Sequence, residues 1–336
     1  MAEVRPLGAD RPDARPHLAI PGPTDLQVNG GGGVLVNADP SPAGLRAVRA
    51  AHRGLGTHAI LPTVITDAPE VMEAAADAVL AARGEGIEGL HIEGPHIAPD
   101  KRGTHDARHI RPPDARTMAV LARLRAAGVP VMLTLAPERA DPAWLAQAAA
   151  LGVVLSAGHS MASADQARAA FAQGVTMVTH LFNAMPPLGH RAPGLVGAAI
   201  LSDAYVGLIA DGHHVAWDAL RIALAAHRPD RSLLVSDAMP TVGGPDRFSL
   251  YGREITVRDG RLVNAEGALA GAHVDLVTCL RRLHRDGGIA LERCVAMATD
   301  IPRAAMRLPP LAIGPGTPAA QVATLDDGLR FAGWLG

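Results

Sequence analysis

Residues 152–180 have the sequence GVVLSAGHSMASADQARAAFAQGVTMVTH, in which two apolar runs flank an alanine-rich segment. Each apolar run has the length of a buried strand, and the segment between them has the spacing of a helix. Ser163 and Gln166 form a capping-box pattern where that helix would begin, and Gly174 follows its end. A strand, a helix and a second strand in this order predict a parallel βαβ unit.

The same alternation extends along the chain in both directions. Apolar runs that predict buried parallel strands lie at 17–25, 58–64, 89–93, 131–138, 152–159, 175–180, 205–211 and 232–237. Alanine-rich helical segments lie between most of these runs, most clearly at 69–84 and 163–174. Eight strands alternating with helices favour an α/β fold of the closed (β/α)₈ TIM-like barrel type over an open sheet.

Three regions are expected along the chain. Residues 1–20 are expected to form an N-terminal tail or a reduced β segment, and 21–308 to form the barrel. Residues 309–336 are rich in Pro and Gly with weak strand signals, which indicates a C-terminal β appendage.

The strand–helix alternation changes after residue 237. Residues 248–267 predict an insertion of two or three short strands, with Asp259-Gly260 as a turn. Two helices are expected to follow, over 272–288 and 291–308.

Composition excludes several classes of partner. The formal net charge is −2 and aromatic residues make up 3% of the chain, which argues against nucleic-acid binding. No apolar run reaches membrane-spanning length, and the first residues lack the apolar core of a secretory signal. Cys279 and Cys294 are therefore expected to be reduced thiols in a cytoplasmic protein without membrane contact.

Polar side chains follow most of the predicted strands at the ends where barrel enzymes hold their chemistry. These residues are Gln27, Glu93, His159, His180, Asp211 and Asp237. One such residue is easily a helix cap or a satisfied buried group, but six strand ends out of eight indicate an active site.

Glu93, His159 and His180 are candidate metal ligands. The two histidines are 21 residues apart, which places them at the same height on adjacent strands. A lone buried histidine is more often a core residue bonded to the backbone. Two imidazoles and one carboxylate on one rim instead match a catalytic site for one divalent ion with an open fourth position. Zinc or iron(II) would suit these ligands.

Asp237 is the expected acid–base group beside that ion, although an aspartate here could also cap the next segment. His214 and Arg191 are candidate substrate contacts, and an arginine would suit a phosphate group. The glycine run 30–33 lacks the Lys-Ser/Thr of a phosphate loop and is expected to be a turn with close backbone approach.

Several segments resemble, in order, the signature segments of N-acetylglucosamine-6-phosphate deacetylases, which belong to the amidohydrolase superfamily. They include PGPTDLQVNGGGG (21–33), HIEGPHIAPDKRGTHD (91–106), SAGHS (156–160), THLFNAMPPLGHRAPG (179–194), IADGHHV (209–215) and VSDAMPTVGG (235–244). The resemblance runs from about residue 21 to about residue 308. It implies hydrolysis of the N-acetyl group of N-acetylglucosamine 6-phosphate by metal-activated water, with Asp237 as base and then acid.

The resemblance also implies roles for further residues. It assigns Glu93, His159 and His180 to the metal, and Arg191 to the phosphate. It assigns the remaining substrate contacts to Thr104, His105, Asn183, Ala184, Asp211, His214, Leu269, Ala270 and Gly271. A homodimer and an amino-sugar phosphate substrate are expected on the same ground.

Two departures from the superfamily pattern matter. Many amidohydrolases have His-x-His after the first strand, whereas this chain has Gln27-Val28-Asn29, which resembles the single-metal branch and makes Gln27 a candidate site residue. The short segment before residue 21 implies that the usual β-sandwich is reduced or absent. Alternatives are N-acetylgalactosamine-6-phosphate deacetylation, a cyclic amidase, or an inactive barrel with a binding role.

Overall fold

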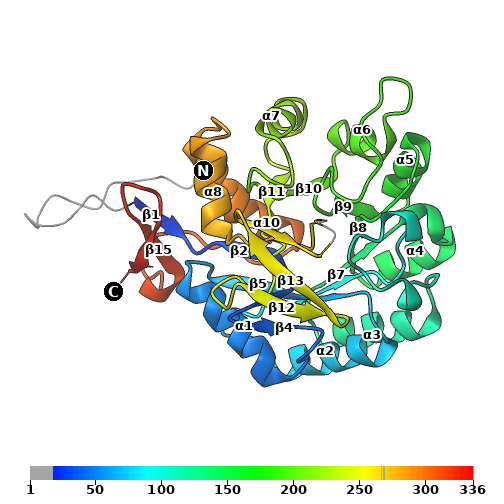
Figure 1. Cartoon of the computed structure of the whole chain (residues 1–336), viewed down its shortest axis with the longest axis horizontal. Helices are drawn as coiled ribbons and strands as arrows, with labels where there is room; N and C mark the ends of the chain where they lie inside the picture. The colour runs from blue at the N-terminus through cyan, green and yellow to red at the C-terminus, as the bar shows by residue number, and fades with distance from the viewer. Residues whose placement is uncertain (1–17, 266, 268, 336) are drawn as a thin grey trace, which may run out of the picture.

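A single parallel sheet of eight strands forms the centre of the molecule (Figure 1). The computed structural model describes residues 18–265, 267 and 269–335. The barrel strands are β2 (Thr24–Val28), β5 (Ala59–Ile65), β6 (Leu90–Glu93), β7 (Val131–Leu135), β8 (Val154–Ala157), β9 (Val175–Val178), β10 (Tyr205–Leu208) and β11 (Ser232–Leu234). They lie in chain order from β2 to β11, and all are parallel.

The barrel closes between its first and last strands. Val28 and Ala238 form a parallel bridge, and the Asn29 backbone N–H donates to the Ala238 carbonyl at 2.9 Å. The predicted (β/α)₈ barrel is therefore confirmed. The first predicted strand, 17–25, divides into β1 (Leu18–Pro21), which belongs to another sheet, and β2. The chain bends at Gly22, where a Cβ atom would lie 2.4 Å from the side chain of His58.

Helices cover the outside of the barrel (Figure 1). They are α1 (Pro42–Gly54), α2 (Pro69–Ala82), α3 (Ala115–Ala126), α4 (Pro142–Ala150), α5 (Ala164–Ala172), α6 (Gly194–Ile200), α7 (Trp217–Ala226), α8 (Leu276–Arg285), α9 (Leu291–Ala298) and α10 (Asp300–Ala305). Single turns of 3-10 helix lie at Pro99–Lys101, Ala107–His109, Pro137–Arg139 and Ala319–Gln321.

The capping box predicted for α5 is present, with the Ser163 side chain accepting from Gln166 N–H and the Gln166 side chain accepting from Ser163 N–H. The single helix predicted over 291–308 is wrong, because the chain breaks at Thr299 into α9 and α10. Pro302 explains the break, since a proline lacks the N–H of a helix interior and is tolerated only in a first turn.

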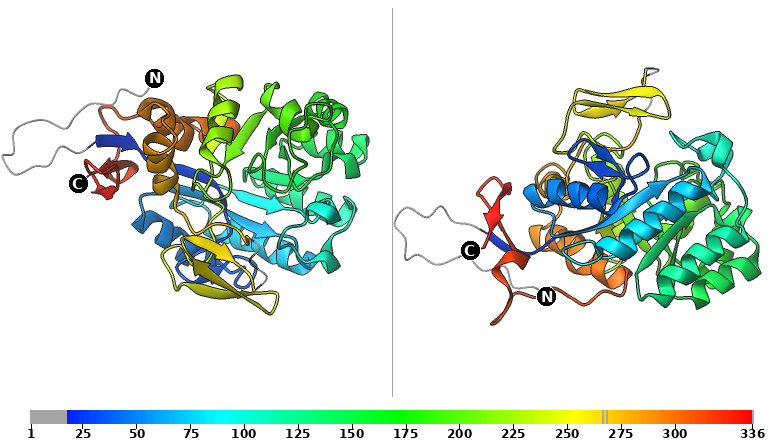
Figure 2. Two further views of the ribbon diagram at one scale, coloured as in Figure 1. Left: turned by 45° about the horizontal axis from the view of Figure 1, so that its top comes forward. Right: turned by 90° about the horizontal axis from the view of Figure 1, so that it is seen from below.

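A small antiparallel sheet lies as a separate layer against the barrel, and Figure 2 shows it projecting from the rest of the molecule. It consists of β12 (Arg247–Leu250), β13 (Arg253–Arg258) and β14 (Arg261–Val263), in agreement with the short strands predicted for the insertion at 248–267. Asp259 and Gly260 have φ angles of 50° and 73°, which is the backbone of a two-residue hairpin turn. The glycine run forms a tight hairpin of β3 (Gly30–Gly31) and β4 (Val34–Leu35).

The two ends of the described chain meet in a separate three-stranded sheet. β1 pairs with β15 (Val322–Leu325), which pairs with β16 (Phe331–Trp334), and both pairings are antiparallel. The Arg53 guanidinium lies 4.1 Å from the centre of the Trp334 ring, which joins this sheet to α1. In the described part of the chain, no helix has the length and apolar character needed to cross a membrane.

The core consists mainly of Ala, Val, Leu and Ile side chains between the strands and the helices. Hydroxyl and imidazole groups bond to one another inside the barrel: His91 contacts Thr63 and Thr134, and Thr134 contacts Thr179. Buried polar groups of this kind are retained only when they are paired. Cys279 and Cys294 are both buried and free.

Candidate active site

The three predicted metal ligands meet at the C-terminal end of the barrel strands. Glu93 Oε1 lies 3.2 Å from His159 Nε2 and 3.1 Å from His180 Nε2, and the two Nε2 atoms are 3.0 Å apart. Ligands about 2.0–2.1 Å from a tetrahedral zinc lie a little over 3 Å from one another, so these atoms are spaced for one ion. All three side chains are buried.

The charges of this cluster also suit a cation. Burial alone would raise the pKa of Glu93, but hydrogen bonds from His159 and His180 lower it well below its usual value. The carboxylate is therefore ionised and available as a ligand. A bound cation would replace protons on the imidazoles as its counter-charge.

Local backbone geometry directs these side chains inward. The φ angles of His159, His180 and Asp237 are 48°, 30° and 53°, a region that non-glycine residues rarely occupy. Such strained conformations cluster at functional sites. His159 Nδ1 lies 2.7 Å from the Lys101 carbonyl, which fixes the tautomer that leaves Nε2 free to bind a metal.

His105 lies beside this cluster, and its ring could be a ligand with Glu93 and His159, since the three ligand atoms lie within 4.8 Å of one another. Its Nδ1, however, accepts the Thr66 backbone N–H at 3.3 Å and lies 2.7 Å from the Thr66 hydroxyl. Burial lowers the pKa of His105 to about 3, so the ring is neutral. Because Nδ1 accepts a backbone N–H, the single ring proton lies on Nε2. That arrangement makes His105 a hydrogen-bond donor, and His180 remains the third ligand.

Asp237 lies next to the cluster and is held by two amides. Its Oδ1 accepts from Gln27 Nε2 at 3.0 Å and from Asn29 Nδ2 at 2.7 Å. Gln27 Nε2 also donates to Glu93 Oε1 at 3.1 Å, so it connects the acid–base candidate to the metal cluster. Burial, together with the nearby charge of Glu93, raises the pKa of Asp237 to about 6.

These groups line one cavity of about 170 Å³. Of the residues predicted from the sequence, it brings together Glu93, Thr104, His105, His159, His180, Asn183, Ala184, His214, Asp237, Leu269 and Gly271. Asp211 lies outside the lining but fixes His214, because its Oδ2 is 2.7 Å from His214 Nδ1 and its Oδ1 accepts the His214 N–H.

Three other predicted residues do not line the cavity. Gln27 lies beneath it and acts through Asp237 and Glu93, and Ala270 is buried in the apolar cluster under the hairpin. Arg191 is exposed in the loop before α6. Sequence reasoning missed Asn29 as a site residue, although it occupies the end of the first barrel strand, and it missed Ile65, Gly103 and Met239, whose side chains or backbone carry no chemical signal.

Known proteins share this barrel and much of its sequence. The chain is 38% identical to N-acetylgalactosamine-6-phosphate deacetylase of Shewanella sp. (strain ANA-3), over 97% of this chain and 84% of that protein. It is 35% identical to human N-acetylglucosamine-6-phosphate deacetylase, over 88% of this chain and 76% of that protein. The chain belongs to the N-acetylglucosamine-6-phosphate deacetylase family.

The solved structures agree with membership of this deacetylase family. The crystal structure of N-acetylglucosamine-6-phosphate deacetylase from Pasteurella multocida superposes with a TM-score of 0.89 at 31% identity, covering 94% of this chain and 84% of that one. No family model matches the sequence. The resemblance identified from the sequence motifs is therefore confirmed, and the barrel with its Glu/His/His cluster is that of a deacetylase suited to a divalent metal.

Proposed function

We propose that this protein hydrolyses the N-acetyl group of N-acetylglucosamine 6-phosphate and releases acetate and glucosamine 6-phosphate. The observation that carries the proposal is the contact of Asp237 with the Glu93–His159–His180 cluster through one amide, Gln27, at the floor of a cavity. An acid–base carboxylate beside a divalent cation is the arrangement needed to hydrolyse an unactivated amide.

Glu93, His159 and His180 would hold the divalent ion. When bound, the ion would polarise the amide carbonyl and lower the pKa of water at this site. Asp237 accepts a proton from the attacking water and later transfers it to the departing nitrogen, because an amine anion is too poor a leaving group to depart unprotonated. Gln27 and Asn29 keep the Asp237 carboxylate in place during both transfers.

His105 is the donor we assign to the amide oxygen. Its Nε2–H is fixed because Nδ1 accepts from Thr66, so it presents a proton to the developing negative charge. His214 also lines the cavity, and Asp211 accepts from its Nδ1 side. This leaves His214 Nε2 to accept from a hydroxyl group of the sugar. Thr104, Asn183, Ala184 and the segment 269–271 are the other proposed sugar contacts.

Arg191 is proposed to recognise the 6-phosphate, because a planar guanidinium matches phosphate oxygens in a bidentate manner. Arg191 is exposed in the loop before α6, so in this proposal it binds the phosphate from the rim of the cavity. Arg191→Ala should reduce kcat/KM for the phosphorylated substrate at least about tenfold, the loss of one charge-assisted interaction. Unphosphorylated N-acetylglucosamine should lose little, and equal losses on both substrates would remove Arg191 from this role.

A second candidate substrate is N-acetylgalactosamine 6-phosphate. The relative with 38% identity carries that activity in its name, whereas the human relative at 35% carries the glucosamine activity. The two sugars differ only in the configuration of one hydroxyl group, so the choice depends on contacts at the cavity rim.

The test is acetate release from each of the two sugar phosphates at equal concentration, with and without a chelator. We expect turnover of N-acetylglucosamine 6-phosphate that a chelator abolishes and that added zinc or iron(II) restores. Faster turnover of the galactosamine substrate would reassign the specificity, and no acetate from either would overturn the proposed function.

Zinc is the ion we propose, at one equivalent per chain, because Glu93, His159 and His180 form one tetrahedral face. Gln27 and Asn29 occupy the place of the second-metal histidines, so elemental analysis should not find two tightly bound ions. We also propose a homodimer in the cytoplasm, which light scattering and cell fractionation would test.

A further inference from the structure

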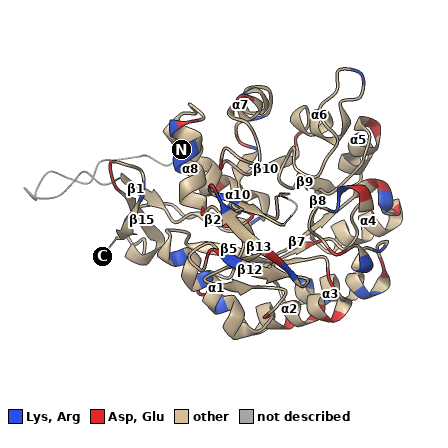
Figure 3. Ribbon diagram, viewed as in Figure 1, with Lys and Arg blue, Asp and Glu red and all other residues tan. Residues whose placement is uncertain are grey.

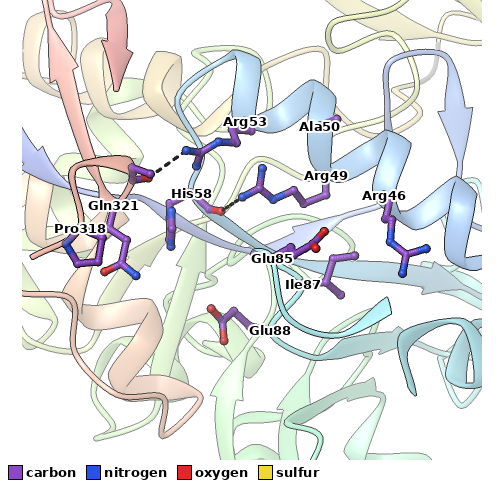
Figure 4. Close-up of a pocket in the computed structure, with 12 residues that line it drawn as sticks. Arg46, Arg49, Ala50, Arg53, His58, Glu85, Ile87, Glu88, Pro318 and Gln321 are labelled. Atoms are coloured by element: carbon purple, nitrogen blue, oxygen red, sulfur yellow. Dashed lines mark hydrogen bonds between the residues drawn. The ribbon is translucent and has the colours of Figure 1, made fainter. Parts of the chain in front are cut away.

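A second hollow, of about 690 Å³, lies at the opposite end of the barrel from the catalytic cavity. Its walls are α1, the loop before β6 and the segment 318–321 (Figure 4). His58 precedes β5 and Glu88 precedes β6, so these residues mark the N-terminal ends of the strands, whereas Glu93 marks a C-terminal end. No residue is shared between the two cavities.

Three arginines from one face of α1 line the hollow at spacings of three and four residues: Arg46, Arg49 and Arg53. Two of them donate to neutral carbonyls: Arg49 to the His58 carbonyl at 3.3 Å and Arg53 to the Ala320 carbonyl at 3.1 Å. Within the described residues, none of the three forms an ion pair with a carboxylate. None of the three is therefore neutralised by a direct ion pair, although Glu85 is close enough to Arg49 to act on its charge.

Arg49 is held in place rather than free in solvent. Its guanidinium packs on Gly86, where a Cβ atom would lie 2.5 Å from Nε and 2.5 Å from the His58 carbonyl. Its Nε is buried and has no hydrogen-bond partner in the described part of the chain. A guanidinium held in this way loses less side-chain freedom when a ligand binds to it.

Two carboxylates lie on the opposite side of the same hollow. Figure 4 shows Glu85 and Glu88 across from the guanidiniums of Arg49 and Arg53. Glu88 Oε1 is 3.7 Å from Arg303, so its charge is partly compensated, whereas Glu85 forms no ion pair among the described residues. Burial and the neighbouring arginines lower the pKa of His58 to about 4, so the ring between the two walls is neutral at pH 7.

We propose that this hollow is a second, non-catalytic binding site for a small molecule with a phosphate at one end and an ammonium group at the other. Adjacent guanidiniums bind a dianion with several oxygen acceptors well, and a phosphate monoester is such a group. Glu85 provides the counter-charge for the ammonium group. An amino sugar phosphate has both ends, and it is the class of product that the proposed function would release.

Isothermal titration tests the phosphate end and the ammonium end of the ligand separately. The three probes are glucosamine 6-phosphate, glucose 6-phosphate and glucosamine. Hydrogen exchange on the same samples locates the binding. We expect glucosamine 6-phosphate to bind most tightly and to protect α1 and the segment 318–321. Glucose 6-phosphate should bind at least about tenfold more weakly at this site, the loss of one charge-assisted contact.

Matched variants assign the contacts. Arg49→Gln should weaken the binding of both sugar phosphates at this site at least about tenfold. Arg49→Lys keeps the charge without the planar guanidinium, so its affinity should lie between those of the wild type and Arg49→Gln. Glu85→Gln should reduce the affinity for glucosamine 6-phosphate to that for glucose 6-phosphate, and should leave the affinity for glucose 6-phosphate unchanged. Arg228→Gln, at an exposed arginine already paired with Asp203 and Asp230, is the control and should change nothing.

Two results would overturn the proposal. One is protection that appears only around the catalytic cavity and is unaffected by Arg49→Gln. The other is equal affinity for the two phosphates with no effect of Glu85→Gln. Neither result depends on acetate release, so failure of the second site and failure of the proposed function are distinguishable.

Discussion

Asp237 has one carboxylate oxygen held and the other available for proton transfer. Oδ1 accepts from both Gln27 and Asn29, whereas no described donor is bonded to Oδ2. Asp237→Asn keeps the shape of the side chain and removes the base, so we expect kcat to fall by about 10²–10⁴-fold. Bound metal should stay at the wild-type level, because Asp237 is not one of the three ligands.

Turnover and metal content should be measured together on Asp237→Asn, with Asp218→Asn on the exposed face of α7 as the control. Near-normal turnover with the metal retained would contradict the acid–base assignment and direct attention to His105 and His214.

The ionisation of Asp237 sets the acid side of the pH profile. Burial and the charge of Glu93 raise its pKa to about 6 when no metal is present, and a cation beside it favours the carboxylate and lowers the pKa again. A general base must be deprotonated, so kcat should be constant above pH 6 and should decrease as the pH falls through a value below 6. A kcat profile from pH 4 to pH 9 with metal-saturated enzyme checks this, and an acid limb centred above pH 7 would contradict it.

The site residues could be predicted from the sequence where an ionisable side chain lies at the end of a predicted strand. Glu93, His159, His180 and Asp237 all follow barrel strands, and the structure brings them together as expected. Thr66 could not be predicted in the same way, because it carries no ionisable group, and both its backbone N–H and its hydroxyl contact His105 Nδ1. A backbone donor can come from any residue, so the side-chain pattern of the sequence reveals this contact only in part.

At the scale of elements, the helix between the two histidine strands is set by its cap. Ser163 Oγ accepts the Gln166 N–H at 3.2 Å, and Gln166 Oε1 accepts the Ser163 N–H at 2.9 Å. Ser163→Ala should therefore lower the free energy of unfolding by about 1 kcal/mol, the usual loss for an N-cap. Thermal unfolding measures it, with Ser163→Thr as a variant that keeps the cap. An unchanged Tm in Ser163→Ala would show that tertiary packing alone holds α5.

Elements were predicted well where the length of a segment and its flanking Pro, Gly or Asp residues indicate the same structure, as for α2 and the turn at Asp259. The errors have identifiable causes. The run 17–25 was expected to be one strand, but β1 ends at Pro21 and β2 begins at Thr24, and only β2 pairs with β5 in the barrel. The segment Pro21-Gly22-Pro23 marks the break in the sequence, whereas the pairing of β1 with the distant β15 has no local signal. The break before α10 did have a signal, Pro302, which the helical spacing around it outweighed.

Over the whole molecule, both signs of charge are distributed across the outer helices (Figure 3). The net charge of −2 gives the chain no long-range attraction for a polyanion. In the two proposals, recognition of a phosphorylated sugar depends instead on individual cations: Arg191 in a loop at one end of the barrel, and the arginines of α1 at the other.

Metal binding should couple the catalytic site to the stability of the whole barrel. The ligands come from β6 and from the ends of β8 and β9, so one ion connects strands that are far apart along the chain. Without the ion, Glu93 stays hydrogen-bonded to His159 and His180, so we expect the chelated protein to remain folded. Zinc should then raise the free energy of unfolding by about 4 kcal/mol at a concentration a thousand times its Kd. Thermal unfolding across a buffered zinc series measures this, with His159→Ala as the control that should lose the dependence. A Tm that is independent of zinc in the wild type, or equally dependent in His159→Ala, would place the ion away from this cluster.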